Sequence, residues 1–197
     1  MSDSTSDLLE EICTERESVD SSTLEQIVIL AVEIAREGRE GRKIGTIFTV
    51  GDSEAVLEHS RPMILDPLKG HASADTSIKS ANVRETLKEL AQLDGAFVID
   101  NRGTALSAAR YLDADTAGID MPLGLGSRHM AGAAITKHTG CVSVVVSTSA
   151  IVRLFDNGEL VAEVIPELWI LNRYSSHIDA PLLTRSDEQM TVLSRME

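Results

Sequence analysis

Apolar residues recur at helical spacing in four stretches of the chain. The clearest stretch follows Ser22 and Glu25, which form a Ser-x-x-Glu capping box ahead of an apolar stripe from Leu24 to Ala35. Gly38 is expected to end that helix, because glycine readily adopts the left-handed conformation of a helix C-terminus. The predicted helices cover residues 22–37, 53–58, 80–93 and 128–137.

Runs rich in β-branched residues predict a second set of elements. Residues 142–147 form a strongly apolar run, which is typical of a buried strand. Asp156, Asn157 and Gly158 predict the tight turn of a hairpin. The predicted strands cover residues 43–50, 95–100, 104–108, 142–147, 151–155 and 159–165, and residues 61–73 are expected to be a loop. Helices alternate with strands early in the chain and strands cluster late, which indicates an α/β domain with a mixed sheet.

The length of the chain, 197 residues, suits one domain with or without a tail. Residues 1–22 carry seven acidic side chains and one basic side chain, so this segment is expected to be an acidic, flexible N-terminal tail. Residues 23–197 are expected to form a single domain, in which the pattern becomes less readable after about residue 165.

The charge narrows the classes of partner. The formal net charge is −13 at pH 7 and aromatic residues make up 3% of the chain. Proteins that bind duplex DNA or RNA need basic side chains to replace the counterions of the phosphates, and proteins that bind single strands need aromatic side chains on which the bases stack. This acidic chain with few aromatic residues is therefore not expected to bind nucleic acid. Only five of the 18 basic residues are lysines, which favours adaptation to a salt-rich cytosol over an ordinary acidic protein. Without a long apolar run or a signal-peptide pattern, we expect a cytoplasmic protein with no membrane partner.

A glycine-rich segment directly precedes the fourth predicted helix. Gly124 and Gly126 let the backbone approach a ligand, and the free N–H groups of a helix N-terminus attract anions. Ser127 adds a hydroxyl, Arg128 adds a planar guanidinium suited to phosphate, and His129 adds a donor near neutral pH. The segment therefore predicts a phosphate site, with a plain helix cap as the alternative.

Two further candidates stand at the ends of predicted strands. Asp94 precedes Gly95 and Ala96 at a helix-to-strand junction, where a carboxylate can hold a divalent cation and small residues admit a flat ligand. Ser147 ends the buried strand and can donate to a phosphate oxygen. On spacing alone, a turn carboxylate and a strand-end hydroxyl remain the alternatives.

Taken together and in this order, these segments resemble the catalytic domain family of the diadenylate cyclases, of the DisA N-terminal type, and its archaeal branch in particular. The match runs from Asp94 through the Gly-Ser-Arg-His segment to Ser147 and the hairpin turn at Asp156. The resemblance implies an α/β fold with a mixed central sheet of roughly seven strands, flanked by helices on both faces. It also implies condensation of two ATP into cyclic di-AMP and two pyrophosphates, at sites that meet face to face in a dimer or higher oligomer.

The resemblance further implies a role for each candidate residue. Asp94 would bind Mn²⁺ or Mg²⁺ and help to activate the attacking 3′-hydroxyl, and Arg128 and His129 would complete the catalytic set. The residues implied in ATP binding are Gly95, Ala96, Leu112, Gly126, Ser127, Arg128, His129 and Ser147.

Two positions depart from the family pattern. The family commonly has Arg-His-Arg where this chain has Met130 in the third place, and Ser-Glu-Glu where it has Ser-Thr-Ser ending at Ser149. The second change removes a carboxylate that can assist the metal. A weakly active or inactive module that binds ATP or cyclic di-AMP is therefore the alternative function, and an oligomeric scaffold without nucleotide binding is the third hypothesis.

Overall fold

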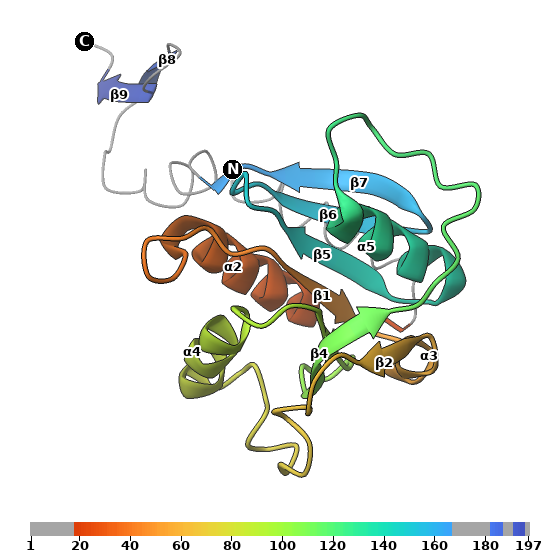
Figure 1. Ribbon diagram of the computed structural model, residues 1–197. Coiled ribbons are helices and arrows are strands. Elements are labelled where there is room, and N and C mark those ends of the chain that lie inside the picture. The colour runs from red at the N-terminus through yellow and green to blue at the C-terminus, as the bar shows by residue number, and fades with distance from the viewer. Residues whose placement is uncertain (1–17, 167–181, 187–190, 196–197) are drawn as a thin grey trace. The chain divides into compact units, whose positions relative to one another are not determined.

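The structure is a computed structural model, and it describes residues 18–166, 182–186 and 191–195 (Figure 1). The chain separates into two compact units, Met1–Pro166 and Glu167–Glu197, and each is described by itself. The boundary between the units falls where the sequence pattern becomes less readable. The predicted tail lies outside the described residues up to residue 17, and residues 18–20 lead directly into the first described helix.

The described part of the first unit contains four helices and seven strands. They are α2 (Ser21–Glu37), β1 (Thr46–Val50), α3 (Ser53–Glu58), β2 (Ser60–Pro62), α4 (Ala81–Leu90), β3 (Ala96–Ile99), β4 (Ala105–Leu112), α5 (Ser127–His138), β5 (Val142–Val146), β6 (Val152–Asp156) and β7 (Glu159–Val164). In the second unit, β8 (Leu182–Ser186) and β9 (Thr191–Arg195) form an antiparallel pair.

The seven strands form one mixed sheet in the order β2-β4-β3-β1-β5-β6-β7. β1 and β3 run parallel, whereas every other pair of neighbours in this sheet is antiparallel. The central strands β1 and β5 are buried along their whole length, which the apolar run over residues 142–147 predicts for β5. The expected α/β fold with a mixed sheet of roughly seven strands is thus confirmed.

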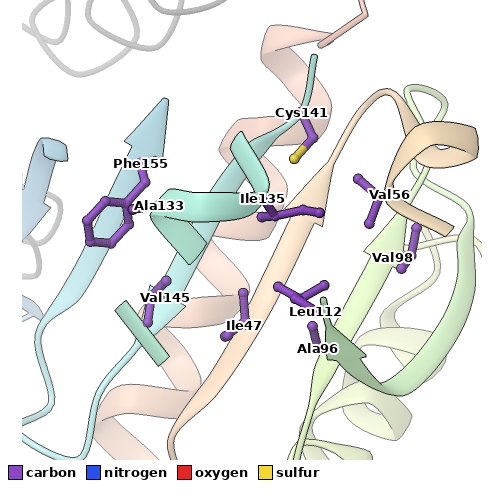
Figure 2. Packing of buried hydrophobic residues seen from close by; sticks show 10 residues of the cluster. All are labelled: Ile47, Val56, Ala96, Val98, Leu112, Ala133, Ile135, Cys141, Val145 and Phe155. Atoms are coloured by element: carbon purple, nitrogen blue, oxygen red, sulfur yellow. The ribbon is translucent and has the colours of Figure 1, made fainter. Parts of the chain in front are cut away.

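Helices α2 and α5 both contact β1, β5 and β6, and side-chain alternation places them on opposite faces. Ile47 and Val145 pack with Ile135 of α5 in one apolar cluster (Figure 2). Phe48, the neighbour of Ile47, points to the other face, where its ring stacks on Phe97 with centroids 4.9 Å apart. Figure 2 shows α2 on that other side, behind the strands.

Small residues bring α5 close to the sheet. A Cβ atom at Gly132 would lie 2.7 Å from Cγ2 of Val145 and 2.9 Å from Oγ of Ser143, distances that real Cβ atoms do not adopt. The hydroxyl of Ser143 donates to the carbonyl of Gly132 at 3.0 Å, so a hydrogen bond occupies the space that a side chain would fill. The small residues of the predicted helix therefore allow α5 to pack closely against the sheet.

The start of α2 differs from the sequence-based expectation. The predicted capping box is wrong, because the side chain of Asp20 caps α2 by accepting from the N–H of Thr23 at 2.8 Å. Ser22 instead donates to Asp20 at 2.6 Å.

Two strand boundaries also differ. The strand β2 overlaps the start of the predicted loop, and the predicted strand over 104–108 extends to Leu112, because β2 pairs with the end of β4. Pairing with a distant segment thus creates strand structure where local composition predicts none.

The strand register gathers the candidate residues at one end of the sheet. β1 pairs Thr46 with Val146 of β5, and Ile47 with Ala96 of β3. The start of β3 and the end of β5 therefore flank the start of β1. Asp94 immediately precedes this row and Ser147 immediately follows it, so residues separated by about 50 positions meet at the same edge of the domain.

Candidate active site

Asp94 lies in the turn that leads into β3, and its side chain is 67% exposed. Its Oδ1 accepts from the N–H of Gly95 at 3.1 Å. Gly95 has a φ of +108°, and a Cβ atom there would lie 2.7 Å from backbone atoms of Ala109 and Arg110 on β4. Only glycine fits this close approach, which explains the small residue that follows the carboxylate.

Arg128 is in the first turn of α5 and connects the helix to Asp94. Its Nη2 donates to Oδ1 of Asp94 at 3.0 Å, in a pair whose side chains are 41% and 67% exposed. A Cβ atom at Gly45 would lie 3.1 Å from Nη1 of Arg128, so the guanidinium packs over this glycine just before β1. An exposed ion pair of this kind adds little stability, and its two charges are accessible to a ligand.

His129, one residue further along α5, is buried and turned to the other side of the helix start. Its Nδ1 accepts from the N–H of Gly126 at 3.2 Å, which satisfies one of the free donors of the helix N-terminus. Burial lowers the pKa of His129, and the charge of Arg153 lowers it further. The lowered pKa favours the neutral ring, and in the tautomer in which Nδ1 accepts from Gly126 the ring proton lies on Nε2.

Two cavities meet at the start of α5. The first has a volume of about 210 Å³, and the residues that line it are Ile47, Met63, Asp94, Gly95, Arg110, Tyr111, Leu112, Ser127, Arg128 and Ala131. Apolar and aromatic side chains form one wall of this cavity, and Asp94 with Arg128 forms the other. A planar apolar group and a phosphate can therefore be held side by side here.

The second cavity has a volume of about 540 Å³ and is more polar. The residues that line it are Leu123, Gly124, Leu125, Gly126, Ser127, Arg128, His129, Ser147, Thr148, Ser149, Ile151 and Arg153. Ser127 and Arg128 line both cavities, so the two spaces adjoin at these side chains. Hydroxyl groups, a neutral imidazole donor and two guanidinium groups suit the oxygens of phosphates.

All of the predicted site residues except Ala96 line one or both of these cavities. Asp94, Gly95 and Leu112 line the first cavity, and His129 and Ser147 line the second. Gly126 also lines the second cavity, and Ser127 and Arg128 line both. Ala96 differs, because it is fully buried in the apolar cluster beneath the first cavity and lines neither space. Strand alternation turns its side chain into the core.

Sequence reasoning missed several lining residues. Met63 and Tyr111 supply the apolar rim of the first cavity, with 42% and 45% of each exposed. Arg110 anchors this wall by donating to the carbonyl of Ser60 at 2.7 Å. Arg153 was missed in the second cavity. These residues lie on or beside β2, β4 and β6, and no local motif marks them, because the strand register alone brings them to the site.

The loop over residues 61–73 holds a separate polar cluster. The Asp66 carboxylate accepts from the N–H of Leu68 at 2.9 Å and from the N–H of Ala108 at 3.2 Å, and it also accepts from Ser107. These bonds fasten the loop to β4. His71 lines a third cavity with Asp66 and is absent from the two cavities at α5, so it does not belong to the candidate site.

A divalent cation at Asp94 would rely on a single carboxylate. Among the residues that the structure describes, no three Asp, Glu, His or Cys side chains converge on one point. Mg²⁺ and its analogues commonly use one or two carboxylates together with substrate phosphates and water, so the exposed Asp94 beside an anion site fits such an ion. Also within the described part, no helix is long and apolar enough to cross a membrane.

Comparisons with known proteins identify the family of this chain. The family model described as DisA bacterial checkpoint controller nucleotide-binding matches residues 33–160. A diadenylate cyclase from Methanocaldococcus jannaschii is 47% identical over 150 residues, which cover 76% of this chain and 47% of that protein. A diadenylate cyclase from Haloferax volcanii is 40% identical over 152 residues, which cover 76% of this chain and 55% of that protein. This chain thus spans about half the length of the curated relatives that it matches.

Solved structures show the same fold at low sequence identity. A hypothetical membrane spanning protein from Bacillus cereus aligns with a TM-score of 0.51 and 18% identity, covering 73% of this chain and 63% of that chain. A double mutant of DacA from Staphylococcus aureus aligns with a TM-score of 0.50 and 20% identity, covering 78% of this chain and 95% of that chain. Together with the matched family model and the archaeal relatives, these findings show that the chain belongs to the diadenylate cyclase domain family, in its archaeal branch.

Proposed function

We propose that the chain is a diadenylate cyclase domain that condenses two ATP into cyclic di-AMP and two pyrophosphates. The observation that carries the proposal is the pair of cavities joined at Ser127 and Arg128. One cavity suits a nucleoside and its first phosphate, and the other suits the remaining phosphates. An elongated molecule that is apolar at one end and strongly anionic at the other fits this arrangement.

The proposed reaction is a transfer of an adenylyl group. The 3′-hydroxyl oxygen of one ATP attacks the α-phosphorus of the other, the bond to the bridging β-oxygen breaks, and pyrophosphate leaves. The hydroxyl proton passes to solvent. A second attack, by the 3′-hydroxyl of the other nucleotide on the remaining α-phosphorus, closes the ring and releases the second pyrophosphate. Such transfer depends mainly on positioning the reacting groups and on offsetting negative charge.

The side chains of the site suit these two tasks. Arg128 lies where the cavities meet and can bind the α-phosphate with its planar guanidinium. Asp94 is the only carboxylate among the described residues that line the first cavity, so it is the group that can accept a hydrogen bond from the attacking hydroxyl. His129 lines the second cavity, where a proton on Nε2 can be donated to a phosphate oxygen. A divalent cation held by Asp94 and phosphate oxygens would offset the charge that develops during transfer.

The reaction requires two chains that face each other. One chain offers one nucleotide site, and the attacking hydroxyl belongs to a second nucleotide. Met63 and Tyr111 at the rim of the first cavity and Leu123 at the second are apolar and exposed at 42%, 45% and 102%. A second copy placed over the cavities would cover these side chains and bring two sites together.

A product assay tests the proposal. Purified protein is incubated with ATP and either Mn²⁺ or Mg²⁺ at several salt concentrations, and the products are separated by chromatography. We expect cyclic di-AMP, with two pyrophosphates for each molecule formed and a rate per chain that rises with protein concentration. No cyclic di-AMP under any of these conditions would overturn the proposal. Tight ATP binding by calorimetry without pyrophosphate release would instead establish the binding-module alternative, which Met130 and Ser149 motivate.

A further inference from the structure

Arg153 is a buried cation on β6 that no sequence motif marks. The residue is 8% exposed, and its Nε donates to Oε1 of Glu163 at 2.6 Å. Glu163 is the residue directly opposite on β7, so the register of the hairpin creates the ion pair. Burying a guanidinium is costly unless it is paired, and this contact uses only the Nε edge of the group.

The far end of the same guanidinium faces His129. Nη1 of Arg153 lies 3.3 Å from Nε2 of His129 and 3.5 Å from Oγ of Ser147. In the tautomer in which Nδ1 of His129 accepts from the N–H of Gly126, Nε2 carries the ring proton and faces the N–H of Arg153; in the other tautomer, Nε2 accepts from Arg153. In the first tautomer, an anionic oxygen that accepts from both groups forms two hydrogen bonds, one of them charge-assisted.

The surroundings of these donors also suit phosphate. His129 and Arg153 line the second cavity, together with Ser147 and Ser149, whose hydroxyl oxygens lie 2.6 Å apart. The cavity adjoins the first one at Arg128, which lines both. A nucleotide whose α-phosphate lies at Arg128 therefore extends its later phosphates toward Arg153.

We propose that Arg153 and His129 form the subsite that holds the β- and γ-phosphates of ATP and then the pyrophosphate that leaves. This inference rests on the proposed function, since it assigns parts of that substrate to the second cavity. Arg153 binds the leaving group directly, and Glu163 is a positioning residue that orients the guanidinium through Nε. The subsite also places a fixed positive charge where negative charge accumulates as the P–O bond breaks.

The choice of arginine follows from the two contacts. Its planar group donates from Nε to Glu163 and from Nη1 into the cavity at the same time. Lysine has one nitrogen on a flexible stem and cannot make both contacts in this geometry. Arg153→Lys is therefore expected to keep the charge and still lose phosphate affinity.

Calorimetry tests the subsite with two probes. These are AMP and an ATP analogue with a methylene group between the α- and β-phosphorus atoms, which resists cleavage. We expect Arg153→Gln to weaken binding of the analogue by about tenfold to a hundredfold and to change AMP binding by less than about twofold. Arg102→Gln, at an exposed turn residue, removes the same charge and is expected to leave both affinities unchanged. Equal losses for the two probes, or no loss for the analogue, would overturn the inference.

A measurement on the unmodified protein covers the case in which the variant fails to fold. Inorganic pyrophosphate is added to the protein labelled with ¹⁵N at histidine, and the ring nitrogens of His129 are followed by NMR. We expect the Nε2 signal to shift with saturation while Nδ1, held by Gly126, moves less. An unchanged Nε2 signal at saturating pyrophosphate would contradict the subsite.

The product assay separates this inference from the proposed function. Cyclic di-AMP formation by the wild-type protein, together with unchanged analogue binding in Arg153→Gln, would remove only the role of Arg153. Analogue binding that depends on Arg153 in a protein that forms no cyclic di-AMP would remove the cyclase function and keep the phosphate subsite.

Discussion

The two cavities that meet at Arg128 differ in their chemistry and in how the chain builds them. The first combines one acidic side chain with an apolar wall from β1 and β4, whereas the second collects hydroxyls, an imidazole and Arg153. Helix α5 contributes to both, because neighbouring residues in its first turn point in different directions. In the proposed function, the start of α5 contacts a nucleoside on one side and phosphates on the other, and strand residues complete each cavity.

The largest expected effect concerns the charge in the first cavity. Asp94→Asn should lower the rate of cyclic di-AMP formation by about 10²–10³-fold, because it removes the negative charge beside the attacking hydroxyl. The melting temperature should stay unchanged, since the side chain is 67% exposed and asparagine can still accept from Arg128. Initial rates measured by chromatography, with thermal unfolding beside them, test both statements.

Asp75→Asn is the matched control for that variant, because Asp75 is an exposed carboxylate outside both cavities. It should keep the wild-type rate. If Asp94→Asn also kept the full rate, the first cavity would have no special role for its carboxylate.

The second effect tests the backbone that shapes the first cavity. Gly95→Ala should lower the free energy of unfolding by about 2–3 kcal/mol, because a Cβ atom at a φ of +108° also meets the backbone of β4. Gly70→Ala separates the two causes, since Gly70 has a φ of +88° with no atom within 4 Å of a Cβ. It should cost about 1 kcal/mol. Denaturant unfolding measures both, and equal losses would show that the close approach contributes nothing.

A smaller effect distinguishes the cavities by ligand. Tyr111→Ala should weaken binding of AMP and of the uncleavable ATP analogue equally, by about 1 kcal/mol or fivefold, because it removes the aromatic rim of the nucleoside cavity. Leu106→Ala on the same strand, 36% exposed and outside both cavities, should leave the two affinities unchanged. A loss of affinity for the analogue alone would mean that Tyr111 contacts the β- and γ-phosphates, and it would contradict the proposed roles of the two cavities.

The smallest effect concerns pH and the second cavity. The lowered pKa of His129 means that the unfolded chain binds this proton more readily than the folded chain. Stability should therefore fall as the pH drops through the ordinary histidine pKa of about 6.5. His129→Gln should remove part of that decrease, and His71→Gln, at an exposed loop histidine, should not. Urea unfolding across this pH range measures it, and identical pH profiles for wild type and His129→Gln would contradict the assignment.

The order of helices and strands could be predicted because it depends on local periodicity and turn residues. β-Branched residues predicted β1, an apolar run predicted β5, and the Asp-Asn-Gly turn predicted the β6–β7 hairpin. Strand β2 could not be predicted in this way, because Pro62 and its polar neighbours have low strand propensity and become a strand only by pairing with β4. The cap of α2 was misplaced for a similar reason, since Ser22 and Asp20 carry equally plausible capping side chains and the helix begins one residue earlier.

The residues of the candidate site also fall into two groups, those that the sequence predicts and those that only the structure shows. Asp94 and the residues of the α5 start could be found because glycine, carboxylate and arginine stand together in short motifs whose physical roles are readable. Ala96 belongs to such a motif, yet strand alternation turns it into the core. Tyr111 and Arg153 stand in ordinary strand sequences, where nothing distinguishes a side chain that faces a cavity from one that faces solvent.

Local sequence therefore sufficed for the family, the mixed sheet and the group of residues around Arg128, because each depends on patterns within a few turns of the chain. Only the tertiary structure showed that Asp94 pairs with Arg128 across 34 positions and that Arg153 faces His129 across 24. Both contacts depend on strand register, and register is set by long-range packing of the whole sheet. The division of the candidate site into a more apolar cavity and a more polar cavity follows from that register.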